Sequence, residues 1–418
     1  MTATAIEQIT YQDLYERWEK ANWRSTEIDF SQDREDWYDK FSDIERRGAL
    51  WNYAMFFHGE DSVADNLSPY IDAAPKEEQK YFLATQQVDE ARHAVFFGRF
   101  MREVVENGDT IAGSLAATKP ELTWGFRRTF ARLDRMADEL RRDRSKPKFA
   151  QAITLYHIVI EAALAQPGQH FIESYLDERG VLPGFRAGMK NVSLDEQRHI
   201  GFGVKVLSEL IAEDPECVDA IEEMLSEVTT YSVGVFVPPN WDMRYIESFG
   251  STMEEVYVHG MQSVESKMRT AGFPLERLAR AFSFAPDTPY EERARRAVRL
   301  LRANVLGEKN GPPDKDPEVM AILFERVKNR VDPSRLSNGG VTIQWDFEDA
   351  DPWFLRVDNG ATSVEQGRLE DPALTFRCRY EDWVDVAAGR EDPRLAMAKR
   401  KLKPKGLRAL LQTRKLFG

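Results

Sequence analysis

Two pentapeptides in this sequence each contain a carboxylate and an imidazole one helical turn apart. They are Asp89-Glu90-Ala91-Arg92-His93 and Asp195-Glu196-Gln197-Arg198-His199, and both contain the pattern Glu-x-x-His. Residues i and i+3 lie on the same side of a helix, so each pattern can direct a carboxylate and an imidazole at one point. Two further glutamates, Glu60 and Glu161, lie upstream of the patterns among apolar neighbours. Together these residues offer four carboxylates and two imidazoles.

This ligand set indicates a dinuclear metal site. Carboxylates are hard ligands and imidazoles are borderline ones, a combination that suits iron and manganese. The chain has only two cysteines, Cys217 and Cys378, far apart in sequence, which argues against a thiolate zinc site. Isolated carboxylates are costly to bury, and metal binding removes that cost. Two Glu-x-x-His patterns with two single glutamates are the ligands of dinuclear iron and manganese sites in helical bundles. The predicted ligands are Glu60, Glu90, His93, Glu161, Glu196 and His199.

The predicted cofactor is two metal ions, Fe/Fe or Mn/Fe, with O₂ as co-substrate, because a metal pair can share the electrons that reduction of O₂ requires. Asp89 and Asp195 directly precede the pattern glutamates. We expect them to accept hydrogen bonds from ligating imidazoles, although exposed helix aspartates are the alternative. The other histidines lack partners at ligand spacing and are expected to be packed or surface residues. They are His58, His157, His170 and His259.

Long helices must position these ligands. Apolar residues recur three and four apart through most of residues 10–285, and prolines fall between the helical stretches. The sequence then changes character: residues 341–347 alternate as a half-buried strand does, and residues 353–357 and 374–379 are further strand candidates. We therefore predict a mainly helical protein with a metal domain at 10–285, a helical connector at 286–330 and a small α+β domain at 331–418.

Composition narrows the location and the partners. A net charge of −13 argues against a general nucleic-acid binder, and two cysteines fit a reducing cytoplasm. The first seven residues lack a basic start and a long apolar run, so we expect no signal peptide. The sequence has no apolar stretch of the about 18 residues that a membrane span needs.

With these residues placed, roughly residues 10–270 resemble the ribonucleotide-reductase R2-like superfamily, and within it the R2-like ligand-binding oxidases. The likeness begins at Trp23 and runs through residues 28–37, 59–63 and 156–165 and through the two Glu-x-x-His patterns. It implies a ferritin-like four-helix bundle, a mixed manganese–iron or di-iron centre, a fatty acid or similar ligand near the metals, and a homodimer.

Three residues bear on the role within that superfamily. R2 subunits normally carry a radical-bearing tyrosine four residues after the first ligand histidine, and here that position is Phe97. A phenyl ring cannot store a tyrosyl radical, which disfavours the ordinary R2 role. In the ligand-binding oxidases a valine and a tyrosine become joined by an ether cross-link. The matching residues are Val63, three after Glu60, and Tyr156, five before Glu161; ordinary core packing is the alternative.

Residues 335–418 resemble a sterol-carrier-protein-2 (SCP2) type lipid-binding domain, an extension that the ligand-binding oxidases do not normally carry. The match follows residues 353–360, 371–376, 381–383, 388–393 and 401–406. The resemblance implies an apolar tunnel for an acyl chain, although its candidate residues could instead fill a small core. These candidates are Phe354, Leu374, Phe376, Trp383 and Leu410.

The end of the chain is basic. Residues 399–415 carry eight basic residues and no acidic one. This face could make weak contact with an anionic membrane surface, and a solvated helix is the alternative that we favour.

The sequence predicts an O₂-activating dimetal oxidase or oxygenase for a hydrophobic or acyl-type substrate, with an external electron donor and a C-terminal domain that binds or presents lipid. The alternative is a lipid-binding metalloprotein whose metal site only oxidises itself or acts as a ferroxidase. A ribonucleotide reductase radical subunit is disfavoured by Phe97 and by the lipid-type C-terminus.

Overall fold

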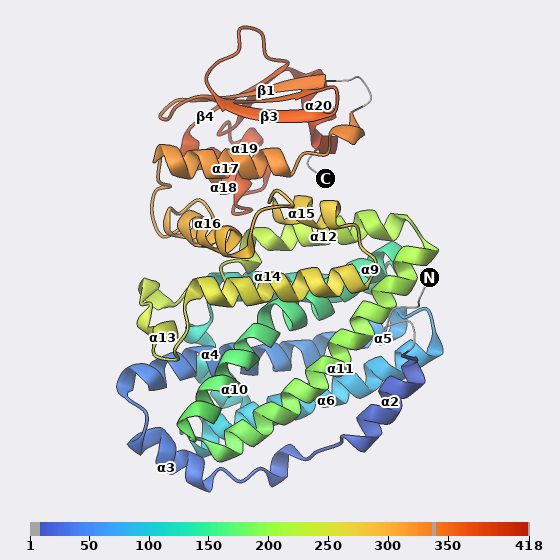
Figure 1. The fold of residues 1–418 in the computed structure, drawn as a ribbon, viewed down its shortest axis with the longest axis vertical. Helices are drawn as coiled ribbons and strands as arrows, with labels where there is room; N and C mark the ends of the chain where they lie inside the picture. Colours follow the sequence, from blue (N-terminus) through green and yellow to red (C-terminus); the bar gives the residue numbers. More distant parts are fainter. Residues whose placement is uncertain (1–8, 337–339, 417–418) are drawn as a thin grey trace. The chain divides into compact units, whose positions relative to one another are not determined.

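The computed structural model describes residues 9–336 and 340–416; the N-terminal stretch considered for a signal peptide lies outside them. The chain forms two compact units (Figure 1). The first contains the residues up to Met224 and Val235–Phe273, and the second contains Leu225–Gly234 and the residues from Pro274 onward. The predicted domain limits at 285 and 330 stay predictions. No helix of the described ranges is long and apolar enough to cross a membrane.

The first unit is a bundle of long helices (Figure 1). Its main members are α4 (Asp43–Asn66), α6 (Glu77–Glu103), the π-helix η3 (Thr154–Ala165) and α11 (Pro183–Glu213). The shorter elements are α2 (Tyr11–Lys20), η1 (Ser25–Glu27), α3 (Ser31–Asp39), α5 (Ser68–Ala73), α7 (Ile111–Thr118), η2 (Lys119–Glu121), α8 (Trp124–Leu140), α9 (Lys146–Ile153), α10 (Gln166–Arg179), η4 (Pro239–Trp241), α13 (Arg244–Glu247) and α14 (Met253–Thr270). Helix α12 (Glu216–Ser232) runs from the first unit into the second.

The start of α11 is fixed by a side chain from another helix. The first amides of a helix have no intrahelical acceptor. Here Asp33 of α3 accepts hydrogen bonds from the amides of Gly184, at 2.8 Å, and Phe185, at 2.6 Å. A Cβ atom on Gly184 would lie 2.2 Å from the carbonyl oxygen of Asp29, so only glycine permits this close approach. This contact fixes the start of the helix that carries the second Glu-x-x-His pattern.

Aromatic rings hold α4, α6 and α11 together. The ring of Phe185 lies 4.4 Å from that of Tyr53 and 4.3 Å from that of Phe100, measured between centroids, and all three are buried. Each such ring pair contributes about 0.5–1.5 kcal/mol beyond its buried area. The core therefore fixes the spacing of the three helices that carry five of the six predicted ligands.

The second unit contains a five-stranded sheet in the order β3-β2-β1-β4-β5. The strands are β1 (Gly340–Phe347), β2 (Trp353–Asp358), β3 (Ala361–Gln366), β4 (Leu374–Cys378) and β5 (Lys403–Lys405). Strands β1 and β4 are parallel, and the other pairs are antiparallel. The helices are α15 (Leu275–Phe282), α16 (Tyr290–Arg302), α17 (Pro317–Asn329), η5 (Pro333–Arg335), α18 (Tyr380–Ala387), α19 (Pro393–Ala398) and α20 (Leu407–Leu416).

Stacked aromatic residues form the centre of this unit. Phe324 of α17 stacks on Trp353 of β2, at 4.6 Å, and on Trp383 of α18, at 4.9 Å between centroids. Among the tunnel candidates, Trp383 therefore contributes to the packed core, and a tunnel stays a prediction. Within the basic tail, Lys399 and Lys401 both pair with Glu391, at 2.8 and 2.6 Å, which neutralises part of the predicted positive face.

Candidate metal centre

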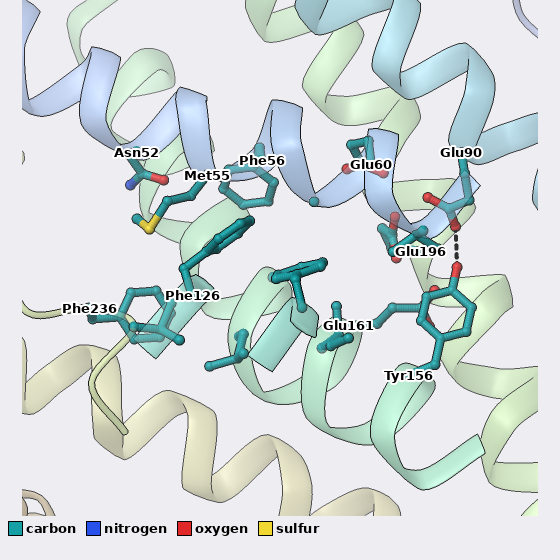
Figure 2. Close-up of a pocket in the computed structure, with 17 residues that line it drawn as sticks. Asn52, Met55, Phe56, Glu60, Glu90, Phe126, Tyr156, Glu161, Glu196 and Phe236 are labelled. Carbon is teal, nitrogen blue, oxygen red and sulfur yellow. Dashed lines mark hydrogen bonds between the residues drawn. The ribbon is translucent and has the colours of Figure 1, made fainter. Parts of the chain in front are cut away.

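The six predicted ligands converge inside the bundle from four helices. Glu60 lies on α4, Glu90 and His93 on α6, Glu161 on η3, and Glu196 and His199 on α11, and all six are buried. Their ligand atoms form two groups in which every atom lies within 4.8 Å of the others. One group contains Glu60, Glu90, His93 and Glu196, and the other contains Glu90, Glu161, Glu196 and His199. Glu90 and Glu196 belong to both groups, so each could be a ligand to both ions of a metal pair. Figure 2 shows these two glutamates beside Glu60 and Glu161.

The two imidazoles face the carboxylates with the same nitrogen. Nδ1 of His93 lies 3.2 Å from Oε2 of Glu60, and Nδ1 of His199 lies 3.2 Å from Oε1 of Glu90. The opposite nitrogen, Nε2, lies 3.1 Å from an aspartate oxygen in both cases. An ionised aspartate can only accept a hydrogen bond, so Nε2 carries the proton in a neutral ring and Nδ1 presents a lone pair to the cluster.

In this arrangement hydrogen-bond acceptors face one another without a donor between them. A bound cation would give these acceptors a partner. Nδ1 of His199 and the Oε2 atoms of Glu161 and Glu196 are buried and have no hydrogen-bond partner among the described residues. Buried polar atoms are normally satisfied, so a group of unpaired acceptors requires an explanation. A pair of divalent cations satisfies these atoms, and a donor set of four carboxylates and two imidazoles suits iron or manganese.

The cluster would bind protons strongly in the absence of a cation. Burial raises the pKa of Glu60 and Glu161 well above the usual range, and for Glu161 the neighbouring charge of Glu196 raises it further. Burial alone would lower the pKa of His93, but the charge of Glu60 and the hydrogen bond to Asp195 outweigh it and raise the pKa. These directions describe a site with too much negative charge for its buried position.

Each pattern supplies the aspartate that holds the imidazole of the other pattern. Asp195 lies against His93, and Asp89 lies against His199. Nε1 of Trp23 donates to Asp195 at 2.8 Å, and Nε1 of Trp18 donates to Asp89 at 2.9 Å. Arg198 donates to both carboxylates. The carboxylates are thus fixed before a metal ion binds.

Trp18 and Arg198 were not predicted as site residues, and Trp23 appeared only at the start of the family resemblance. Both tryptophans lie in the N-terminal segment, far in sequence from the aspartates that they contact. The one local signal was the repeated aspartate before each pattern glutamate.

The π-helix η3 brings Tyr156 and Glu161 to the same side. The sequence predicts helices through most of residues 10–285, and the helix over Thr154–Ala165 is a π-helix rather than an α-helix. Hydrogen bonds from i to i+5 stack residues that are five apart, whereas an α-helix stacks residues three or four apart. The hydroxyl of Tyr156 donates to Oε1 of Glu90 at 2.5 Å and accepts from Gln86 at 2.9 Å.

An apolar cavity ends at the cluster. Its walls are mainly aromatic and aliphatic, and its inner end contains all four predicted glutamate ligands together with Tyr156 (Figure 2). Val63 also belongs to its lining. The apolar wall includes Met55, Phe56, Phe126, Phe130, Ile160 and Phe236. An apolar molecule in this cavity would lie against the carboxylates. Phe97, at the position of the radical tyrosine, is buried, and its ring stacks on Phe56 at 5.8 Å.

The remaining histidines do not join the cluster. His157 is buried, with Nε2 3.1 Å from Oε1 of Gln86, and burial lowers its pKa to about 3. Nε2 of His58 lies 3.1 Å from the hydroxyl of Thr118. His170 and His259 are exposed and stack on each other at 5.2 Å between ring centroids.

Comparison with known proteins agrees with the two predicted resemblances. The sequence model described as "Ribonucleotide reductase, small chain" matches residues 2–232, and the model described as "SCP-2 sterol transfer family" matches residues 323–417. These matches confirm the predicted fold class, a helical R2-type bundle followed by a small α+β domain.

Solved structures point the same way. An R2-like ligand-binding oxidase from Sulfolobus acidocaldarius is 25% identical, with a TM-score of 0.54, over 69% of this chain and 97% of that one. A point mutant of an R2-like ligand-binding oxidase with an anaerobically reconstituted Mn/Fe cofactor is 22% identical, with a TM-score of 0.55, over 64% of this chain and 95% of that one. At that identity the second likeness supports the fold alone.

Proposed function

The chain belongs to the ribonucleotide reductase small chain family, and we propose that its first unit is an oxygen-activating dimetal oxidase for a hydrophobic or acyl-type substrate. The observation that carries this proposal is the apolar cavity whose inner end is formed by the four buried glutamates. A cavity with aromatic walls and a few polar groups at one end is typical of a site for an apolar small molecule.

Two metal ions would be held by the six predicted ligands. Glu60 and His93 would hold one ion, Glu161 and His199 would hold the other, and Glu90 and Glu196 would bridge them. When bound, an iron pair or a manganese–iron pair would supply the reduction of O₂ and the oxidising power needed to attack a C–H bond. An external donor would return the electrons that turnover requires.

The protein's own residues have separate roles in this proposal. Asp89 and Asp195 hold the imidazoles in the tautomer that offers Nδ1 to the metals. Tyr156 orients Glu90 through its hydroxyl. The aromatic walls exclude water and direct an apolar substrate toward the glutamates. Oxidation at a C–H bond would therefore occur in a dry, fixed environment.

The second unit would bind or present the lipid substrate. The match of residues 323–417 to the SCP-2 sterol transfer family supports lipid binding. Hydroxylation and desaturation both remain compatible with this division of labour. The homodimer, the cytoplasmic location and weak contact with a membrane surface stay predictions.

The proposal requires metal binding and substrate-dependent turnover. Protein loaded under reducing conditions should hold close to two equivalents of iron or manganese, and the double variant Glu90→Ala/Glu196→Ala should lose both, because these side chains belong to both groups. Loaded protein should then consume O₂ over many turnovers when a fatty acid or acyl compound and a reductant are present. Unchanged metal content in the double variant would contradict the proposal.

A second function is favoured by the presence of both Val63 and Tyr156 in the lining of the apolar cavity. In this second function, the metal site would oxidise only the protein itself or act as a ferroxidase. The second unit would bind lipid, and no external substrate would be turned over. A single burst of O₂ uptake, equal for protein with and without substrate, would favour this function over the oxidase.

A further inference from the structure

A second cavity also has Glu196 in its lining, and most of its lining residues are polar. It has a volume of about 440 Å³ and lies among α10, α11 and α14, which contact one another in the first unit (Figure 1). Its lining consists mostly of amide, hydroxyl, imidazole and carboxylate side chains. Glu196 is the one residue shared by the linings of the two cavities.

The inner end of this polar cavity carries two unpaired buried groups. Gln169 is 3% exposed, and its Nε2 atom has no hydrogen-bond partner among the described residues. Glu196 is 4% exposed, and its Oε2 atom is also unpaired. The first group is a donor and the second is an acceptor, so water molecules can satisfy both as long as no metal ion is bound to Glu196. The inner end therefore suits a hydrated species.

The outer end carries side chains that can coordinate a cation briefly. The imidazoles of His170 and His259 are exposed and stack on each other. The carboxylate of Glu173 is half-buried and accepts a hydrogen bond from Ser193. Among the described residues, groups of three or more ligand side chains with their ligand atoms within 4.8 Å of one another occur only at the buried cluster, so these outer groups form no resident metal site.

The charges in the cavity favour a cation over an anion. Two carboxylates, Glu173 and Glu196, line it against one ammonium group, that of Lys267. Nζ of Lys267 donates to Oε1 of Gln166 at 3.2 Å, and burial lowers the pKa of Lys267. The ammonium group is therefore engaged by a neighbour rather than aimed at a ligand.

We propose that this polar cavity is the path by which hydrated divalent metal ions reach the cluster, with Glu196 as the first resident ligand that they meet. The inference rests on the proposed function, because it assumes that the cluster binds metal. A divalent ion can pass the aromatic cavity only by losing its water, and desolvation of an ion in apolar surroundings costs many kcal/mol. The polar cavity lets the ion exchange water for oxygen and nitrogen ligands stepwise.

The kinetics of Co²⁺ binding test this path without any turnover. Co²⁺ is followed by its visible absorption after rapid anaerobic mixing with the metal-free full-length protein, and its release is followed with an excess of chelator. Ser266→Trp narrows the exposed outer end, and Gln169→Leu removes the inner amide. A metal ion uses the same path to enter and to leave, so an obstructed path slows Co²⁺ binding and Co²⁺ release by the same factor. Both rates should therefore fall several-fold in each variant, while the Kd and the stoichiometry stay unchanged.

Two further variants complete the experiment. Asn52→Trp introduces the same side chain as Ser266→Trp but lies in the lining of the apolar cavity, and it should leave both rates unchanged. Glu173→Gln removes one carboxylate, so it should slow binding most at low ionic strength, where attraction of cations is least screened.

Wild-type rates in both Ser266→Trp and Gln169→Leu would overturn the inference and leave the proposed function standing. The same holds if Asn52→Trp alone slows the rates. Wild-type protein that binds no Co²⁺ would overturn the proposed function and the inference together.

Discussion

Asp195 directly precedes Glu196 of the second Glu-x-x-His pattern, yet its Oδ2 atom lies 3.1 Å from Nε2 of His93 in the first pattern. Asp89 has the same relation to His199. Each imidazole is thus fixed by the opposite helix, so α6 and α11 must be correctly packed before either histidine can present Nδ1. The cluster and the helix packing depend on each other through these two contacts.

This relation predicts a loss of metal affinity in Asp195→Asn. An asparagine amide can donate to Nε2, which would move the ring proton to Nδ1 and remove the lone pair that faces the metal. Loss of such a supporting hydrogen bond typically lowers metal affinity by about 10–100-fold. Competition with a calibrated chelator measures the Kd. The exposed Asp177→Asn serves as the control, and an affinity in Asp195→Asn equal to that of the control would contradict the prediction.

A covalent cross-link is expected between the side chains of Val63 and Tyr156. Both residues line the apolar cavity, and the family resemblance implies an ether cross-link between them. Loading with Mn²⁺ and Fe²⁺ in air should yield a linked peptide pair that is lighter by two hydrogens, with O₂ as the oxidant. Mass spectrometry of the digest detects it. Anaerobic loading and Tyr156→Phe should both give unlinked peptides, and a linked pair in either sample would disprove the assignment.

The ionised carboxylate of Glu45 stabilises the metal-free protein, and we expect this contribution to be lost in acid. Burial alone would raise its pKa, but hydrogen bonds from Ser42 and Tyr175 outweigh burial and lower the pKa from 4.5 to about 2. A carboxyl with a lower pKa in the folded state stabilises the fold above its unfolded pKa, and that contribution is lost as the pH falls from about 4.5 toward 2. Glu45→Gln should therefore be less stable than wild type at pH 7, and this difference should shrink in acid.

Urea unfolding of metal-free protein between pH 3 and pH 7 measures this difference. Asp43→Asn is the matched control, because Asp43 is exposed in the same first turn of α4. A difference between Glu45→Gln and wild type that stays constant across this range would count against the assigned cause.

Removal of residues 310–418 tests the role proposed for the lipid-binding unit. All six predicted ligands lie outside the deleted segment, so metal content should stay near two equivalents. Oxidation of long-chain substrates should become slower because presentation is lost, whereas short soluble substrates should be oxidised at the original rate. Substrate-dependent O₂ uptake measures both. Unchanged kinetics with long-chain substrates would rule out a presenting role.

The placement of each pattern glutamate beside its histidine could be foreseen because it rests on local geometry, whereas the convergence of the four helices was predicted from the ligand set of known dimetal bundles. Glu90 and His93 are one turn apart on any helix, and so are Glu196 and His199. The pairing of each aspartate with the opposite histidine could not be foreseen, because it depends on how α6 and α11 pack. The π-helix was also missed, since the apolar run before Glu161 reads equally well as a buried α-helix.

In the second unit the predicted strands correspond to β1, β2 and β4, which occupy the middle of the sheet. Strands β3 and β5 were missed, and both are edge strands. The sequence of β3 is mostly polar and exposed, and β5 is the tripeptide Lys403-Pro404-Lys405. Edge strands often carry charged residues and proline, which protect against pairing with other chains, so they lack the alternating signal that marks a half-buried strand.

The parallel pairing of β1 with β4 has a consequence for biosynthesis. Strand β1 is synthesised before β4, and the antiparallel hairpin of β2 and β3 is synthesised between them. The central strand β1 therefore cannot pair with β4 until this hairpin has been made. The six predicted ligands, in contrast, have all been translated by His199. During synthesis, the nascent chain can therefore assemble its metal-binding helices while the sheet is still incomplete.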